Sequence, residues 1–194
     1  MEFVRYDEVI GLLREHGVTE AAPDGGRVYL EMVDNNDVVY LHLAGHDSKA
    51  SPHDGASVVR VDRDRLAAVV EHIIHKLRLN QVLLIPVCEW RKVFDAVAFS
   101  LADNEEWQAV DTAATVELNT RDPLLCEPGE FHTVNALVKV LLNDADSPEQ
   151  GLTLTTTAAP VTLELVPGGA VRISIGNRVL ADEVVDIFGS SSRG

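Results

Sequence analysis

The spacing of apolar residues along the chain follows two periods, one typical of helices and one typical of strands. Apolar residues three and four positions apart predict amphipathic helices. Such helices are expected at residues 3–16, 62–79, 90–102, 104–110, 131–141 and 178–188. Alternating or continuous apolar runs predict strands. These runs lie at residues 28–33, 38–43, 57–61, 81–87, 115–118, 152–157, 161–166 and 171–175.

Two pairs of strands are expected to form β-hairpins. Strands 28–33 and 38–43 flank a polar tetrad of the kind that favours a turn. Strands 161–166 and 171–175 flank Pro167-Gly168-Gly169-Ala170, where two glycines suit a tight connection. Both pairs are therefore expected to be antiparallel.

The first strands of the two hairpins have similar sequences, Val-Tyr-Leu-Glu-Met-Val and Val-Thr-Leu-Glu-Leu-Val. One interpretation is an internal duplication with halves at about 1–102 and 103–188. The other interpretation is chance, because alternating strands resemble one another. Both interpretations stay open from the sequence.

The order of elements favours a two-layer α+β sandwich, a largely antiparallel sheet with helices on one face. Residues 57–87 form a strand, helix, strand unit whose strands should be parallel if they share a sheet. In the helix expected at 90–102, Phe99 lies opposite the other apolar residues, which indicates a central helix covered on both faces. We expect one domain at 1–188 and a flexible tail at 189–194.

The net charge of the chain indicates which classes of partner it can attract. The chain has 16 basic and 31 acidic residues, a net charge of -15, of which residues 98–194 contribute -10. Such a surface repels nucleic acid and anionic lipid, and it attracts basic proteins or metal cations. The N-terminus has no basic flank followed by an apolar stretch, so neither a signal peptide nor a membrane span is expected. Two cysteines among aliphatic neighbours favour a reducing, cytoplasmic location.

The densest group of chemically active residues follows the strand at 38–43. His42, His46, Asp47, His53 and Asp54 combine imidazoles with carboxylates. Together they could hold a divalent metal that activates water for hydrolysis. The alternative is an exposed loop, since Asp, His, Ser and Gly all tolerate turns and solvent.

Other sites of catalysis have weaker support. Cys88 lies between a buried strand and a helix, where a thiol can be activated, but a buried structural thiol is the favoured interpretation. Gly168 and Gly169 join two strands instead of opening a helix, so they do not form a nucleotide-binding loop. Ser174 is expected to be the outward-facing residue of its strand.

Three classes of function follow. The first is a non-enzymatic acidic module, a protein-interaction scaffold or chaperone-like protein, with a protein partner or self-association as a homodimer or other homo-oligomer. The second is a metal-dependent hydrolase that uses residues 42–54, and the third is a small-ligand binding protein. No cofactor other than this metal is expected.

Overall fold

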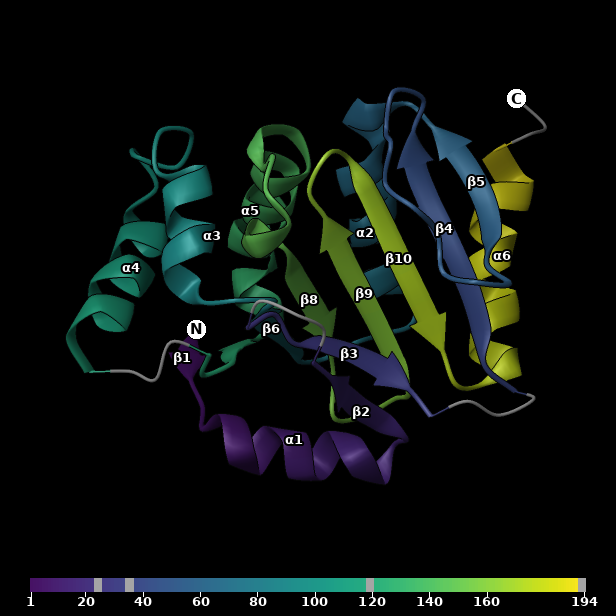
Figure 1. Cartoon of the computed structure of the whole chain (residues 1–194), viewed down its shortest axis with the longest axis horizontal. Coiled ribbons are helices and arrows are strands. Elements are labelled where there is room, and N and C mark those ends of the chain that lie inside the picture. The colour runs from purple at the N-terminus through teal and green to yellow at the C-terminus, as the bar shows by residue number, and fades with distance from the viewer. Residues whose placement is uncertain (23–25, 34–36, 118–120, 192–194) are drawn as a thin grey trace.

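The computed structural model describes residues 1–22, 26–33, 37–117 and 121–191. Figure 1 shows how the helices and strands are arranged. The helices are α1 (Tyr6–Glu15), α2 (Arg63–Lys76), α3 (Trp90–Val97), α4 (Glu105–Glu117), α5 (Phe131–Asp144) and α6 (Arg178–Ser191), with short 3-10 turns η1 (Pro128–Glu130) and η2 (Pro148–Gln150). The strands are β1 (Glu2–Phe3), β2 (Val18–Ala21), β3 (Tyr29–Met32), β4 (Val39–Gly45), β5 (Ser57–Val61), β6 (Val82–Pro86), β7 (Leu124–Cys126), β8 (Leu152–Thr155), β9 (Val161–Val166) and β10 (Ala170–Ile175).

The strands of the described residues form one large sheet and one small one. The large sheet has eight strands in the order β1-β7-β6-β8-β9-β10-β4-β5, and β2 pairs with β3 in a separate ribbon. In the large sheet β4 and β5 are parallel, and the other neighbouring strands are antiparallel. The predicted α+β class with a largely antiparallel sheet is therefore confirmed.

Alternation along β6 separates the two faces of this sheet. Val82 and Leu84 belong to the main hydrophobic core, whereas Leu83 and Ile85 belong to a second cluster. Successive side chains of a strand point to opposite faces. Every residue of β6 is buried, so both of its faces are covered.

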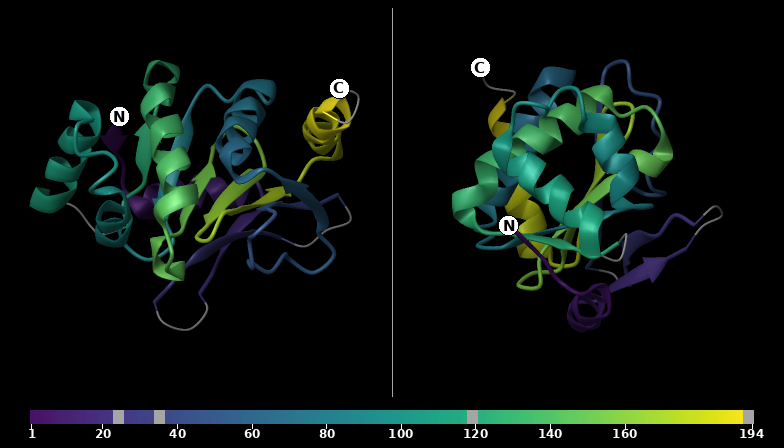
Figure 2. Two further views of the ribbon diagram at one scale, coloured as in Figure 1. Left: turned by 90° about the horizontal axis from the view of Figure 1, so that it is seen from above. Right: turned by 90° about the vertical axis from the view of Figure 1, so that its left-hand side faces the viewer.

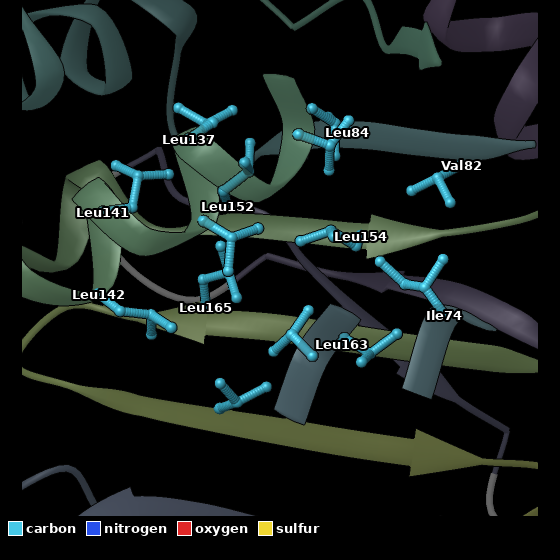
Figure 3. Packing of buried hydrophobic residues seen from close by; sticks show 14 of the residues in the cluster. Ile74, Val82, Leu84, Leu137, Leu141, Leu142, Leu152, Leu154, Leu163 and Leu165 are labelled. Atoms are coloured by element: carbon cyan, nitrogen blue, oxygen red, sulfur yellow. The ribbon is translucent and has the colours of Figure 1, made fainter. Parts of the chain in front are cut away.

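The main core lies between one face of the sheet and helices α2 to α6. Figure 3 shows leucines of β8 and β9 pointing toward α5, with Ile74 of α2 beside them. The α5 side chains recur at helical spacing, which is why that helix presents one continuous apolar stripe to the strands. The stripe consists of Phe131, Val134, Leu137, Val138, Leu141 and Leu142.

The opposite face is partly covered by α1 and the β2–β3 ribbon. Val9, Ile10 and Leu13 of α1 are buried with Leu30 and Met32 of the ribbon. Figure 2 shows α1 and the ribbon on the side of the sheet away from α2 and α5. We call the two sides the helix-covered face and the ribbon-covered face. Helix α1 is thus the exception to the expectation that helices occupy one face.

The hairpin predicted from strands 28–33 and 38–43 is wrong. In the structure β3 pairs with β2, and β4 pairs with β10 and β5. Strand β4 gains partners on both edges by joining the large sheet, which a hairpin with β3 alone would not provide. The hairpin of β9 and β10 is confirmed, and Gly168 and Gly169 both have the positive φ that its turn requires.

The segment after β6 differs most from expectation. Helix α3 ends at Val97, and Phe99 is exposed instead of buried, so the interpretation of a central helix is wrong. The strand predicted at 115–118 is wrong within the described residues, because α4 continues through Glu117. Asn104 caps α4 as expected, since its side-chain oxygen accepts a hydrogen bond from the Trp107 N–H at 2.9 Å.

The direction of distant strands and the two ends of the predicted domain are the remaining features of the fold. Strands β5 and β6 share the sheet and point the same way, with β4, β10, β9 and β8 between them. The proposed duplication loses the support of matching hairpins and stays a prediction, as does the single domain at 1–188. Helix α6 runs to Ser191, and the rest of the predicted tail, residues 192–194, lies outside the described residues. Among the described helices, none has the length and apolar character needed to cross a bilayer.

Candidate functional site

On the ribbon-covered face, β9, β10 and β4 place a row of two charged residues and a histidine side by side, which we call the charged row after Glu164 and Arg172. The register aligns Glu164 with Arg172, and Arg172 with His42. Arg172 Nη1 donates to Glu164 Oε1 at 3.1 Å and to Oε2 at 3.2 Å. Both side chains are largely buried. Burial strengthens such a pair, but it also makes either charge costly if the partner is lost.

The connection between β4 and β5 is held against this charged row. Arg172 Nε donates to the Ser51 carbonyl oxygen at 3.0 Å. Arg60 Nη1 donates to the carbonyl oxygens of Gly45 at 2.8 Å and Ser48 at 3.2 Å. We call residues 46–56 the β4–β5 connection. Because two arginines bind its backbone, it lies on the sheet as an ordered cover.

His42 lies beneath this cover and is only 1% exposed. Neither of its ring nitrogens has a hydrogen-bond partner of good geometry among the described residues. Burial lowers the pKa of His42 below its ordinary 6.5, and the nearby charges of Arg172, Arg60 and His53 lower it further, against a small opposing effect of the Ala50 backbone. His42 is therefore a neutral, buried imidazole at neutral pH.

The other residues of the predicted metal site have separate surroundings. His46 Nε2 lies 3.5 Å from Asp62, and Asp47 lies 3.3 Å from Arg63. His53 packs on Tyr40 with ring centroids 5.6 Å apart. Within the described ranges no three His, Cys, Asp or Glu side chains gather to hold a metal ion. The metal site, and the hydrolase that depends on it, stay predictions.

A cavity of about 330 Å³ lies where the ribbon, the sheet and the β4–β5 connection meet. We call it the ribbon cavity. Its lining consists of Glu31, Met32, Tyr40, His53, Asp54 and Ser174. Ser174 is only 3% exposed, so the expectation that it simply faces outward is wrong, because the ribbon and the connection cover its strand.

A second hollow, also of about 330 Å³, lies between α3 and α4. We call it the α3–α4 groove. Its apolar lining consists of Phe94, Ala98, Leu101, Ala102 and Trp107. Its polar lining consists of Arg91, Asp95, Gln108, Asp111 and Thr115. Figure 1 shows both helices at the end of the molecule farthest from β5 and α6.

The floor of the groove rests on stacked aromatic rings. Phe94 and Trp107 have ring centroids 5.2 Å apart, and Trp90 stacks on Phe94 at 5.7 Å. Phe3 packs edge-on against Trp90, also at 5.7 Å. Together with Phe99, half of the chain's two Trp, three Tyr and five Phe residues lie at this one end. Trp90, Phe94 and Trp107 are buried in the main core, whereas Phe99 is exposed. An exposed aromatic side chain of this kind is frequent in protein interfaces.

Helix α4 forms the outer wall of the groove and is fixed to α5. Glu106 accepts a hydrogen bond from the Thr133 hydroxyl, and its carboxylate lies 3.1 Å from His132 Nε2. These contacts, the Thr133 hydrogen bond first, lower the pKa of Glu106. Trp107 and Val110 of α4 are buried in the main core. The wall is therefore held in place at one turn of α4.

The rim of the groove carries the carboxylates of Asp95 and Asp111, which are among its lining residues. Phe99 is not among the lining residues, but it directly follows Ala98 of the lining in the sequence, and it is 95% exposed. From residue 93 to residue 120 the sequence has no Lys, Arg or His, whereas it includes Asp95, Asp103, Glu105, Glu106 and Asp111. Arg91 lies at one end of the groove and pairs with Asp95 at 3.3 Å.

The two thiols offer no comparable site. Cys126 is buried, and burial raises the pKa of its thiol to about 12. Cys88 is half-buried, so the expectation of a buried thiol at this position is wrong, and both cysteines are free. The Cys126 thiol is held in its protonated form and is therefore a poor nucleophile.

Comparison with known proteins adds no second line of evidence. The chain matches no protein-family model, no curated protein and no solved structure. The function must therefore be inferred from the chain's own geometry.

Sequence reasoning found part of the ribbon cavity and missed the groove. Two of the five predicted site residues, His53 and Asp54, line the cavity, and His42 lies on the same face of β4 as Tyr40. One feature of the sequence could have indicated the groove. Residues 93–120, which include Phe99, contain no Lys, Arg or His.

Proposed function

We propose that this protein is a non-enzymatic interaction module that binds a basic, amphipathic segment of a partner protein in the α3–α4 groove. The observation that carries the proposal is the combination of an aromatic groove floor and an acidic rim with Phe99, which is 95% exposed and follows Ala98 of the groove lining in the sequence. Large exposed aromatic side chains cost solubility, and in protein interfaces they are frequent anchors of binding.

The charge of the rim selects the chemistry of the partner. Asp95 and Asp111 line the groove, and Asp103 and Glu105 follow the exposed ring in the sequence. The chain as a whole carries a net charge of -15. Basic side chains on the partner would be attracted from a distance and would meet these carboxylates at the rim. Apolar side chains between them would pack on Phe94, Leu101 and Trp107.

A second copy of this chain fits the groove less well than a basic partner. In a symmetric dimer the same patch lies on both subunits. The acidic rim of one copy would then face the acidic rim of the other, and like charges across an interface are unfavourable. Charge complementarity therefore favours a partner of opposite charge.

The test uses a synthetic helical peptide with leucine on one face and lysine on the other. Calorimetric titration at low ionic strength should show saturable binding, which weakens as salt is added. Phe99→Ser should weaken binding about tenfold or more, because an aromatic anchor is removed. Asp111→Asn should weaken it less, by a few-fold, because one of several carboxylates is lost.

Matched controls separate the groove from general effects of charge and hydrophobicity. Val179→Ser removes an apolar side chain that is 69% exposed on α6, and Asp182→Asn removes an exposed carboxylate on the same helix. Both should bind the peptide like the unaltered protein. A peptide with glutamate in place of lysine should not bind. The proposal is wrong if Phe99→Ser binds the basic peptide normally, or if Phe99→Ser turns a dimer into a monomer in sedimentation experiments.

A further inference from the structure

The ribbon-covered face has an unusual composition for a covered sheet. Beside β6 it is apolar, as the buried Leu83 and Ile85 show. Toward β10 and β4 it becomes polar, yet Ser174 and His42 there are buried as well. Burying polar groups without partners costs stability. The ribbon cavity lies over this polar part. The buried polar residues therefore lie beside a space that a ligand can enter.

The ribbon cavity has a buried serine in its wall. Ser174 is 3% exposed and lines the cavity. Its backbone is paired in the ladder between β9 and β4, and its side chain lies in the wall of the cavity. A buried hydroxyl at the wall of a cavity is available to a bound molecule as donor or acceptor.

The charged side chains that line the cavity are carboxylates. Glu31 comes from the ribbon and Asp54 from the β4–β5 connection. Neither carboxylate forms an ion pair with a described residue. Two arginines on this face, Arg60 and Arg172, are bound to backbone carbonyls or to Glu164 and are not among the lining residues. The lining therefore favours a cation.

Two rings complete the lining. Tyr40 and His53 have centroids 5.6 Å apart and planes inclined by 52°, so that their rings form an open angle. Aromatic faces attract organic cations, with the strongest attraction where the cation is desolvated. Met32 adds an apolar, polarizable thioether to the same wall.

We propose that the ribbon cavity binds a small organic ammonium ion, with Glu31 and Asp54 as its counter-charges and Tyr40 as its aromatic wall. The volume of about 330 Å³ is large for a bare metal ion, and it lies at the lower end of small-molecule sites, which span roughly 300–1,000 Å³. The described residues also offer no group of three metal ligands. This site is separate from the α3–α4 groove and does not depend on the function proposed for it.

The test compares choline with its neutral carbon isostere, 3,3-dimethylbutan-1-ol. The two molecules have nearly the same shape, so a difference in binding reports the charge. Nuclear magnetic resonance titration should show saturable shifts at Ser174 and at the His53 ring with choline, and much weaker shifts with the alcohol. Acetate should produce no saturable shift at these residues.

Variants of the carboxylates locate the bound charge. Asp54→Asn and Glu31→Gln should each weaken choline binding about threefold to tenfold, and the double variant should weaken it more. Asp64→Asn removes an exposed carboxylate on α2, on the opposite face, and should leave binding unchanged. Phe99→Ser should also leave it unchanged, since the groove is a separate site.

Three outcomes would overturn the proposal. The first is choline binding that is absent at millimolar concentration. The second is equal binding of the neutral isostere, which would make the cavity an apolar site. The third is a double variant, folded according to its spectrum, that binds choline as the unaltered protein does.

Discussion

The two faces of the large sheet are built on opposite principles. The helix-covered face is aliphatic: Leu163 and Ile173 are fully buried against helices. One residue away along the same strands, the ribbon-covered face carries Thr162, Glu164 and Arg172. The first face gains stability from packing, which improves with every methylene buried. The second face depends on a few specific polar contacts, and it leaves a cavity and an unpartnered imidazole.

The difference separates the part of the molecule that makes it fold from the parts that are free to act. Where burial is complete and apolar, a residue has no role beyond packing. Where polar groups are buried beside a cavity, or apolar groups are exposed beside a groove, stability alone gives no reason for the residue. The ribbon cavity is a place where polar groups are buried, and the α3–α4 groove is a place where an apolar group is exposed.

The largest effect is expected from the helix-covered face. Leu163→Ala should lower the free energy of unfolding by about 2–5 kcal/mol, because it leaves a cavity among residues that cannot easily collapse. The neighbouring change Thr162→Ala removes fewer atoms from the other face and should cost about 1 kcal/mol. Urea denaturation of both variants measures the contrast. Equal losses would mean that the two faces do not differ as described.

The next largest effect concerns the buried ion pair. Glu164→Gln leaves Arg172 without a charged partner, and it should cost about 2–3 kcal/mol, since the pair is mostly but not fully buried. The control is Glu149→Gln, which removes the partner of Lys92 in an exposed pair with atoms 3.1 Å apart. Thermal unfolding should show a much smaller change for this control. A loss of similar size in both variants would contradict the burial argument.

A change in the opposite direction is expected at His42. His42→Leu should raise the free energy of unfolding by about 1–3 kcal/mol at neutral pH, because it removes a buried polar ring whose nitrogens have no hydrogen-bond partner of good geometry among the described residues. A destabilised variant would show that the imidazole has a partner that matters for folding.

The same residue gives a pH dependence. Its pKa is lowered in the folded protein from the ordinary 6.5, so below that pH the unfolded chain binds a proton that the folded one excludes. The stability that the protein has because His42 stays neutral is fully present above about pH 6.5. It is lost as the pH falls toward the lowered pKa that His42 has in the folded protein. The difference in stability between His42→Leu and the unaltered protein should therefore grow on acidification. A difference that is constant with pH would contradict the neutral, buried state of His42.

The smallest effect tests hydroxyl groups on the ribbon-covered face. Thr155 Oγ1 donates to the Val161 carbonyl oxygen at 2.8 Å, whereas the Thr162 hydroxyl has no partner among the described residues. Thr155→Val should cost about 1 kcal/mol, and Thr162→Val about 0.5 kcal/mol or less. Paired thermal unfolding curves would check this. A reversed order would mean that the Thr162 hydroxyl, not the Thr155 hydroxyl, is the one that is bonded.

The sequence predicts most elements of the fold because their apolar period is local. Helices α2 and α5 and strands β6, β9 and β10 follow from runs of residues that carry their own signal. The pairing of β4 could not be predicted in this way, since its partners β10 and β5 are chosen by the whole sheet. Strand β2 was missed because its four residues, Val-Thr-Glu-Ala, show little apolar alternation.

The candidate sites are harder to predict because they depend on exposure. Judged by residue type alone, Phe99 would be expected in the core. Only in the structure, where α3 ends at Val97, is Phe99 seen to be exposed. Residues 42–54 have the types that bind metals, but arginines hold the backbone of this region and His46 and Asp47 pair with other residues. The type of each residue can be read from the sequence, whereas the direction in which its side chain points depends on contacts with residues that are distant along the chain.

The most direct test of the proposed function uses the chain's own tryptophans. Both of them, Trp90 and Trp107, lie in the aromatic cluster of the α3–α4 groove. Titration with the leucine and lysine peptide should shift their fluorescence in a saturable manner at low salt, and both Phe99→Ser and high salt should suppress the shift. A peptide that binds without changing tryptophan fluorescence, or that changes it equally in Phe99→Ser, would contradict the groove as the binding site.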